Sequence, residues 1–328
     1  MEPILYVVLF LVLAAEFVNG WTDAPNAIAT VVSTRVMSRG TAVAMAVVFN
    51  IIGVFSGTAV AVTIGKGIVD STIITPSAIG AALVGIVIWS TLAARFGIPT
   101  SESHALVAGL AGAALATSGP QALLWSGWSK VLIGLLLSSV VGFILAYFFA
   151  KLIRRAFATS MPSTAGRSFR RWQIATAAFL AFNHGSNDGQ KFIGVFTLVL
   201  MLGGVIATFH VPVWVVLLCA ATMGLGTSVG GWKIIHEMGV RMVDLKPWQG
   251  FCAQVAAGGT IFFASRFGIP LSTTHTIVTS MMGVAASRKF KHVRWDIASK
   301  VVVAWVLTFP ICGAIAYATA YFAKLILH

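Results

Sequence analysis

The chain has 328 residues, of which 58% are hydrophobic and only 9% are charged, and its formal net charge is +13 at pH 7. A typical soluble domain carries about 25% charged residues, so this composition excludes a chain that covers its whole surface with water-facing side chains and predicts a lipid environment. The basic residues gather in short loops between apolar segments, which is typical of membrane orientation and argues against nucleic-acid binding.

Ten apolar stretches follow one another in two sets of five, and each is long enough to enter or cross a bilayer. The first set covers residues 4–34 with a break near 19–26, then 41–64, 78–96, 99–117 and 128–150. The second set covers 172–200 with a break near 183–190, then 213–230, 249–266, 270–286 and 297–323. The sequence therefore predicts an all-α, multi-pass membrane protein. The stretches 99–117 and 270–286 stay open between full spans and re-entrant hairpins.

A basic linker, residues 151–171, separates the two sets. It contains no acid and six basic residues, which are Lys151, Arg154, Arg155, Arg167, Arg170 and Arg171. The positive-inside rule places this linker in the cytoplasm. We thus expect an N-terminal repeat over 1–150 and a C-terminal repeat over 172–328.

Two motifs occur once in each half. Residues 17–26 return as 182–191, which matches Asp23 with Asp188. A second motif, Gly-Ile-Pro followed by hydroxyl residues and a histidine, ends at His104 in the first half and at His275 in the second. Internal repeats built from broken apolar helices, with polar residues at the breaks, are typical of secondary transporters whose binding site lies between the repeats.

Corresponding loops of the two halves differ in charge. The first loop of the first half carries Arg35 and Arg39, whereas its counterpart, residues 201–211, has neither Lys nor Arg. In the other two pairs the near-neutral loops are 65–77 and 117–128, and their basic counterparts are 231–248 and 287–296. Because only one member of each pair is basic, the halves are predicted to lie upside down relative to each other, with five segments each and both termini outside.

Four of the nine acidic residues lie inside apolar stretches, namely Glu16, Asp23, Glu102 and Asp188. A carboxylate at membrane depth costs about 2.5–3.5 kcal/mol or more unless it is compensated, so such residues usually line a pathway or a site. The matching positions of Asp23 and Asp188 favour a functional role over an ion pair formed for packing. Glu16 and Glu102 have no acidic counterpart and stay open between the two roles.

The aspartate motifs contain Gly and Pro residues that predict helix breaks. Asp23 and Asn26 are three residues apart and share one face of a helical turn, where they can jointly ligate a hard cation. Asn187 and Asp188 offer similar oxygens in the second half, and the candidate Na⁺ ligands are Asp23, Asn26 and Asp188. Lys191 stands where Asn26 stands, so the two halves cannot be chemically equivalent.

The hydroxyl clusters follow a proline that predicts a helix start within the bilayer. There the free amide groups and the hydroxyls point at one place, which suits a tetrahedral oxyanion. Hydroxyls also hold membrane helices together, but the repetition of the whole motif favours the anion site. The candidate ligands are Thr100, Ser101, Ser103, Ser272, Thr273 and Thr274. His104 and His275 stay open between orienting a hydroxyl, relaying a proton and satisfying backbone carbonyls.

With these four motifs in order, the chain resembles the inorganic phosphate transporters of the PiT type, from Phe17 to the last helix. The resemblance implies inverted repeats, extracellular termini, a homodimer, and transport of phosphate with Na⁺ or H⁺ or as a metal–phosphate complex. It also implies that Asp23, Asn26, Asn187 and Asp188 bind the coupling cation or the substrate, and that Ser101, Ser103, Ser272, Thr273 and Thr274 hold phosphate. The chain departs from the family pattern at Thr22 and at Gly189-Gln190-Lys191.

The function predicted from the sequence is import of phosphate across the cytoplasmic membrane by alternating access, driven by a coupling ion and without a further cofactor. Lys191 disfavours a second Na⁺, which favours proton coupling or a reduced sodium stoichiometry, with Glu102, His104, His275 and Lys191 as candidate proton-relay residues. The alternatives are a sulfate or other oxyanion permease, a passive channel, and an intramembrane enzyme with a Ser nucleophile and a His base. Duplication of the Ser/His clusters argues against the enzyme.

Overall fold

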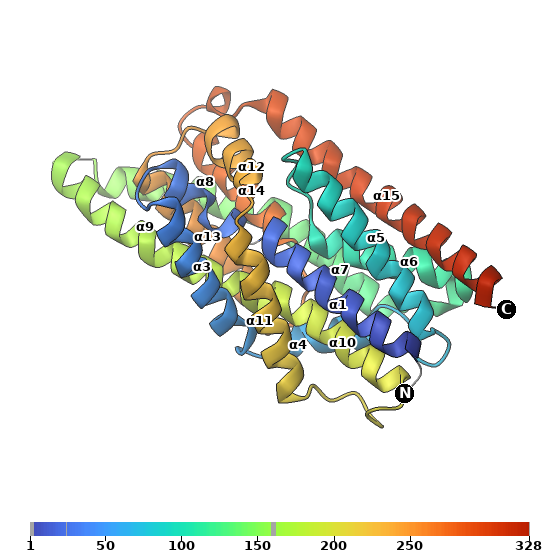
Figure 1. Cartoon of the computed structure of the whole chain (residues 1–328). Coiled ribbons are helices and arrows are strands. Elements are labelled where there is room, and N and C mark those ends of the chain that lie inside the picture. Colours follow the sequence, from blue (N-terminus) through green and yellow to red (C-terminus); the bar gives the residue numbers. More distant parts are fainter. Residues whose placement is uncertain (1–2, 24, 159–161, 328) are drawn as a thin grey trace.

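The computed structural model describes residues 3–23, 25–158 and 162–327, and helices account for nearly all of this part of the chain (Figure 1). The helices of the first half are α1 (Pro3–Thr22), α2 (Pro25–Ser33), α3 (Arg39–Val54), α4 (Ala59–Gly67), α5 (Pro76–Arg95), α6 (Glu102–Thr117), α7 (Trp125–Leu136) and α8 (Gly142–Ala156). Two short turns join this half: the 3₁₀ turn η1 (Pro120–Ala122) and the π-helical turn η2 (Leu137–Val141). The all-helical fold expected from the sequence is thereby confirmed.

The second half has the helices α9 (Pro162–His184), α10 (Gln190–Leu202), α11 (Val213–Val229), α12 (Trp232–His236), α13 (Pro247–Arg266), α14 (Thr273–Ala286) and α15 (Trp295–Leu327). Its short turns are the π-helical η3 (Gly185–Gly189) and η4 (Glu237–Met242) and the 3₁₀ turn η5 (Phe290–His292). Each of the ten expected stretches coincides with at least one helix.

Three local features differ from the expectation. The break expected near 183–190 is a π-helical turn that continues directly from α9 into α10, because this segment has glycines but no proline to remove a backbone donor. The helix α3 bends by 69° into α4, and α11 bends by 61° into α12 and η4. The sequence analysis predicted neither a break within residues 41–64 nor a helix at the position of α12.

Helix length separates the elements into two groups. By length and composition, four helical stretches can cross a membrane, or up to six if each bent pair is one span; the first stretch includes residue 24, which lies outside the described residues. The four are Pro3–Ser33, Pro76–Arg95, Trp125–Ala156 and Trp295–Ile326. The helices α6 and α14, with 16 and 14 residues, are shorter than a full crossing requires.

Helix packing follows the same pattern in both halves. In the first half α1 packs on α11, and in the second half its counterpart α9 packs on α3 (Figure 1). In the same way α5 and α6 pack on α15, and their counterparts α13 and α14 pack on α8. Likewise α4 packs on α10, as α12 packs on α2. Each half thus supplies partners for the other, and the aspartate motifs lie where the two halves meet.

Much of the expected linker is helical. Lys151, Arg154 and Arg155 lie on the last turns of α8, and Arg167, Arg170 and Arg171 lie on the first turns of α9. Residues 159–161 of this linker lie outside the described residues. The Arg170 guanidinium donates to the carbonyl oxygen of Arg35 at 3.1 Å, which joins the linker to the first basic loop.

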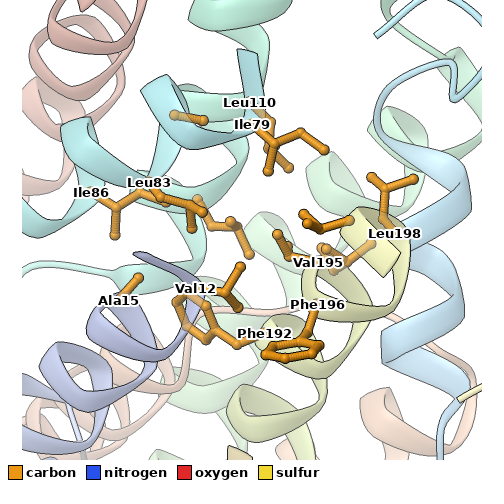
Figure 2. Close-up of a cluster of buried hydrophobic side chains, with 14 of the residues drawn as sticks. Val12, Ala15, Ile79, Leu83, Ile86, Leu110, Phe192, Val195, Phe196 and Leu198 are labelled. Carbon is orange, nitrogen blue, oxygen red and sulfur yellow. The ribbon is translucent and has the colours of Figure 1, made fainter. Parts of the chain in front are cut away.

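The apolar core packs the inner faces of these helices. Figure 2 shows one cluster, in which Val12 and Ala15 of α1 lie near Leu83 of α5 and Phe192 of α10. Large apolar side chains elsewhere on α1, α8 and α15 are exposed, for example Phe10, Phe148 and Val306. Exposed apolar surface of this kind is expected where lipid is the solvent.

Backbone contact of α3 with the end of α9 and with η3 depends on glycine, which allows a test. A Cβ atom at Gly53 would meet the carbonyl oxygen of Phe182, whereas one at Gly40, in the same helix, would meet nothing within 4 Å. We expect Gly53→Ala to destabilise the protein by about 1–3 kcal/mol, the usual cost of overpacking, and Gly40→Ala to be nearly neutral. Thermal unfolding followed by size-exclusion chromatography measures both. Equal stability of the two variants would contradict this packing.

Candidate functional site

The candidate site lies where helix ends from both halves converge. Asp23 follows α1, Asn26 is in the first turn of α2, and Asp188 lies in η3. Thr273 and Thr274 form the first turn of α14. All five side chains are buried, with at most 2% of their surface exposed. The structure thus brings together residues that are up to 251 positions apart in the sequence.

A single threonine hydroxyl joins the two aspartates. The Thr273 Oγ1 atom lies 3.2 Å from Asp23 Oδ2 and 3.1 Å from Asp188 Oδ2. Because a hydroxyl has one proton to donate, it can satisfy only one of the two carboxylates at a time. The Thr274 hydroxyl also donates to Asp23, and the Asn26 amide donates to Asp23 Oδ1 at 2.5 Å and to Thr274 Oγ1 at 2.7 Å. The pair Asp23–Asp188 therefore forms the centre of the site.

Lys191 supplies the positive charge of this centre. Its ammonium donates to Asp188 Oδ1 at 2.5 Å, to Ser103 Oγ at 2.5 Å and to the Leu271 carbonyl at 2.9 Å. The Ser103 hydroxyl itself donates to Leu271 O at 2.8 Å. Lys191 thus connects α10 to the start of α6 and to the segment before α14. Lys191 follows Asp188 by three residues along a helical turn, just as Asn26 follows Asp23.

The remaining hydroxyls of the expected phosphate site have other partners. The Ser101 side chain caps α6 by accepting from the His104 amide at 3.3 Å, and the Ser272 side chain caps α14 by accepting from the His275 amide at 3.1 Å. Thr100 is buried just before the first cap. Ser103, Thr273 and Thr274 are therefore the predicted hydroxyls that directly contact the charged centre, while Ser101 and Ser272 fix the two helix starts around it.

The other candidates lie around this centre. Glu102 accepts from the Thr22 hydroxyl at 2.9 Å and from the Ser90 hydroxyl at 2.7 Å. The Asn187 amide donates to Ser265 Oγ at 2.9 Å and to Ile269 O at 3.3 Å. Asn187 was expected to be a cation ligand, but within the described residues it makes no hydrogen bond to Asp23 or Asp188.

The two histidines of the repeated motif meet each other. The His104 and His275 rings are 4.5 Å apart, edge to face, and His275 also stacks on Trp305 at 3.6 Å. The Ser139 hydroxyl lies 3.3 Å from His275 Nδ1. The pair is buried one turn beyond the helix caps, and its imidazoles make no hydrogen bond to Asp23 or Asp188 within the described residues.

The sequence analysis missed His184 and Asn50. The His184 Nε2 atom lies 3.6 Å from Asp188 Oδ2, and its Nδ1 lies 3.1 Å from Asn50 Oδ1. Asp23, His184 and Asp188 each offer a ligand atom within 4.8 Å of one another. His184 and Asp188 are four residues apart, so the sequence could have predicted that they share one face of a helix. No local pattern predicts the contact of Asn50.

The expected cation ligands fit a small cation in part. The Asn26 Oδ1 atom is buried and has no hydrogen-bond partner, so it remains available as a ligand beside Asp23. Asp188, however, already carries the ammonium of Lys191 on one oxygen. A cation at Asp23 and Asn26 is therefore compatible with the geometry, and a second one at Asp188 would compete with Lys191.

Comparisons with known proteins agree on one family. The profile of the phosphate transporter family matches residues 19–316. The chain is 42% identical over 323 residues to a probable low-affinity inorganic phosphate transporter of Rhizobium meliloti, which covers 98% of this chain and 96% of the relative. It is 39% identical over 311 residues to a protein of the same description from Bacillus subtilis, with 93% of each chain covered.

One solved structure has the same fold. It is described as the sodium-dependent phosphate transporter, and it matches with a TM-score of 0.91 and 23% sequence identity over 99% of this chain and 100% of the other. At this identity the match establishes the fold alone.

The buried ion pair allows a stability test. Lys191→Met should destabilise the protein by about 3–5 kcal/mol, because Asp188 would remain as an uncompensated buried charge. The double variant Asp188→Asn with Lys191→Met removes both charges and should recover most of this loss. Thermal unfolding in detergent measures the three proteins. A single variant as stable as the unmodified chain would show that the ion pair contributes nothing.

Proposed function

The chain belongs to the phosphate transporter family, and on that premise we propose that it imports inorganic phosphate across the cytoplasmic membrane as a symporter driven by H⁺ or Na⁺. Its relatives are named as transporters, which supports a transport role for this chain. The observation that carries the proposal is the buried cluster in which Asp23 and Asp188, from opposite halves, share the hydroxyl of Thr273.

Phosphate is the substrate because of the mixture of donors and acceptors in this cluster. Hydroxyls and amide groups at the starts of α6 and α14 suit a tetrahedral oxyanion. The aspartates discriminate between anions: phosphate near neutral pH keeps at least one proton, and that O–H donates a hydrogen bond to a carboxylate, whereas sulfate has no such proton and is repelled. A sulfate or other oxyanion permease is the second candidate, and the buried carboxylates argue against it.

The coupling ion follows from the same charges. Lys191 neutralises Asp188, which leaves Asp23 and Asn26 as ligands for one small cation. This arrangement supports proton coupling or a single Na⁺ more than a pair of symmetric cation sites. Glu102, His104 and His275 are proposed as proton-relay residues, since all three are buried near the helix starts that flank the aspartates.

We further propose that the two repeats have inverted topology and that transport proceeds by alternating access. The matching helix pairings, the counterpart bends of α3–α4 and α11–α12, and the identical serine caps of α6 and α14 support two copies of one folding unit. The loop charges support a cytoplasmic linker with both termini outside. A homodimer is proposed from the resemblance to PiT transporters.

Substitution of the aspartates tests the site. In proteoliposomes, Asp23→Asn and Asp188→Asn should each lower labelled phosphate uptake at least about tenfold, equivalent to about 1.4 kcal/mol in the rate-limiting free energy. Asp70→Asn, in the loop after α4, is the matched control and should transport normally. If both site variants move phosphate at the normal rate, the proposed role of the aspartates is wrong.

Competition and gradients test the substrate and the coupling. Excess unlabelled sulfate should leave phosphate uptake nearly unchanged, because sulfate cannot donate to Asp23 or Asp188. Phosphate should accumulate against its gradient only while a proton or sodium gradient is imposed, each applied separately. Equilibration without accumulation under either gradient would indicate a passive channel, and full inhibition by sulfate would indicate a general oxyanion permease.

A further inference from the structure

One buried acid lies outside the cluster described above. Glu16, on α1, has no exposed surface, and its Oε2 atom accepts a hydrogen bond from the Asn19 amide at 3.1 Å. Its second oxygen, Oε1, is buried without a hydrogen-bond partner, as is the Asn19 carbonyl oxygen. Glu16 follows directly after Ala15, which belongs to the apolar cluster shown in Figure 2. No basic side chain forms an ion pair with Glu16 among the described residues.

The other three buried acids have hydrogen-bond partners within reach of both carboxyl oxygens. Both oxygens of Glu102 accept from hydroxyls. Asp23 accepts from Thr273, Thr274 and an amide, and Asp188 accepts from Thr273 and an ammonium. Asp23 Oδ2 and Asp188 Oδ2 share the single proton of Thr273, whereas Glu16 Oε1 is the one buried carboxyl oxygen of the described chain that has no hydrogen-bond partner at all. An ionised carboxylate left in this state pays its desolvation cost without compensation, whereas a carboxylic acid carries its own proton.

The space around Glu16 leaves little room for a hydrated ion. A Cβ atom at Gly20 would meet the Met223 carbonyl oxygen, and one at Gly226 would meet that of Phe17, so α1 and α11 are in backbone contact close to Glu16. A Cβ atom at Gly189 would lie 3.6 Å from Glu16 Oε1 itself. A proton needs no such space.

From this geometry we propose that Glu16 is the binding site of the coupling proton, an inference that rests on the proposed transport of phosphate. A proton from the outer side binds Glu16 Oε1, crosses with one phosphate and leaves to the cytoplasm. Glu16 does not touch the substrate in this scheme; it changes the charge beside the site.

The groups that face Glu16 explain why its proton and the phosphate would bind together. Asp188 of η3, Lys191 of α10, Cys219 of α11 and Glu102 of α6 lie close enough to interact electrostatically with Glu16. The helices α2 and α5 place no ionisable side chain toward it within the described residues. An ionised Glu16 would add a negative charge beside Asp188 and would oppose the arrival of an anion, so protonation of Glu16 strengthens phosphate binding. By thermodynamic linkage, phosphate then strengthens proton binding to Glu16 by the same factor.

The experiment compares Glu16→Gln with the matched control Glu237→Gln, which removes an acid outside this region. Both proteins are reconstituted in proteoliposomes with a pH-sensitive dye inside. Glu16→Gln should retain phosphate–phosphate exchange, which moves no net proton, but should lose phosphate-dependent proton entry by on the order of tenfold or more. Glu237→Gln should keep both activities.

Several outcomes overturn the proposal. The proposal is wrong if Glu16→Gln still carries protons in with phosphate at the normal ratio. It is also wrong if a folded Glu16→Gln protein loses phosphate exchange, since Glu16 would then act on the substrate itself. If the unmodified chain exchanges phosphate without moving protons, the inference fails while phosphate transport stands. If the unmodified chain moves no phosphate, the proposed function fails.

An infrared measurement keeps the proposal testable if Glu16→Gln does not fold. The unmodified protein at neutral pH should have a carbonyl band of a buried protonated carboxylic acid. The band should shift when glutamate is labelled with ¹³C, and it should persist in Glu102→Gln. Absence of a labelled band would overturn the assignment.

Discussion

The buried ion pair between Lys191 and Asp188 is the interaction on which the rest of the site depends. An ammonium and a carboxylate with 1% exposure are stable inside a protein only if every donor and acceptor is used. Here Lys191 fills its three donors with Asp188, Ser103 and the Leu271 carbonyl, so one side chain holds together the starts of two helices and a π-helical turn. Asp23 is held separately, by hydroxyl and amide donors alone.

The same architecture explains why a binding site forms at this depth. The helices α6 and α14 are short and begin at serine caps, and the hydroxyls of Ser103, Thr273 and Thr274 in their first turns contact Lys191 and the aspartates. Glycines allow η3 to approach α3 at backbone distance, and Asp188 of η3 lies within hydrogen-bond distance of Thr273. Chemical asymmetry is built into this symmetric frame, because Lys191 replaces Asn26 in only one half. The proposed substrate is thus surrounded by similar helix starts but meets two different aspartates.

The sequence predicted the parts of this structure that follow from local patterns. The apolar stretches located the helices, and the repeated motifs identified Asp23, Asp188 and the hydroxyls near them. The π-helical turn at 185–189 and the bends after α3 and α11 were missed, because glycine-rich segments allow several backbone paths and packing selects one. Contacts such as Ser103 to Leu271 join residues 168 positions apart, and no local pattern encodes them. The ion pair of Lys191 with Asp188 was predictable from their spacing of three residues. The sequence analysis instead interpreted Lys191 as a source of asymmetry, as a residue that disfavours a second Na⁺ and as a candidate proton relay.

A structure determined with phosphate bound tests the central claim most directly. The account predicts density for one tetrahedral anion between Ser103, Thr273 and the two aspartates, with the Asp23–Asp188 pair accepting a hydrogen bond from it. The claim would be contradicted if the buried cluster were unchanged and the phosphate density lay instead in the surface cavity of about 390 Å³ that is lined by Arg241, Arg294 and Lys300.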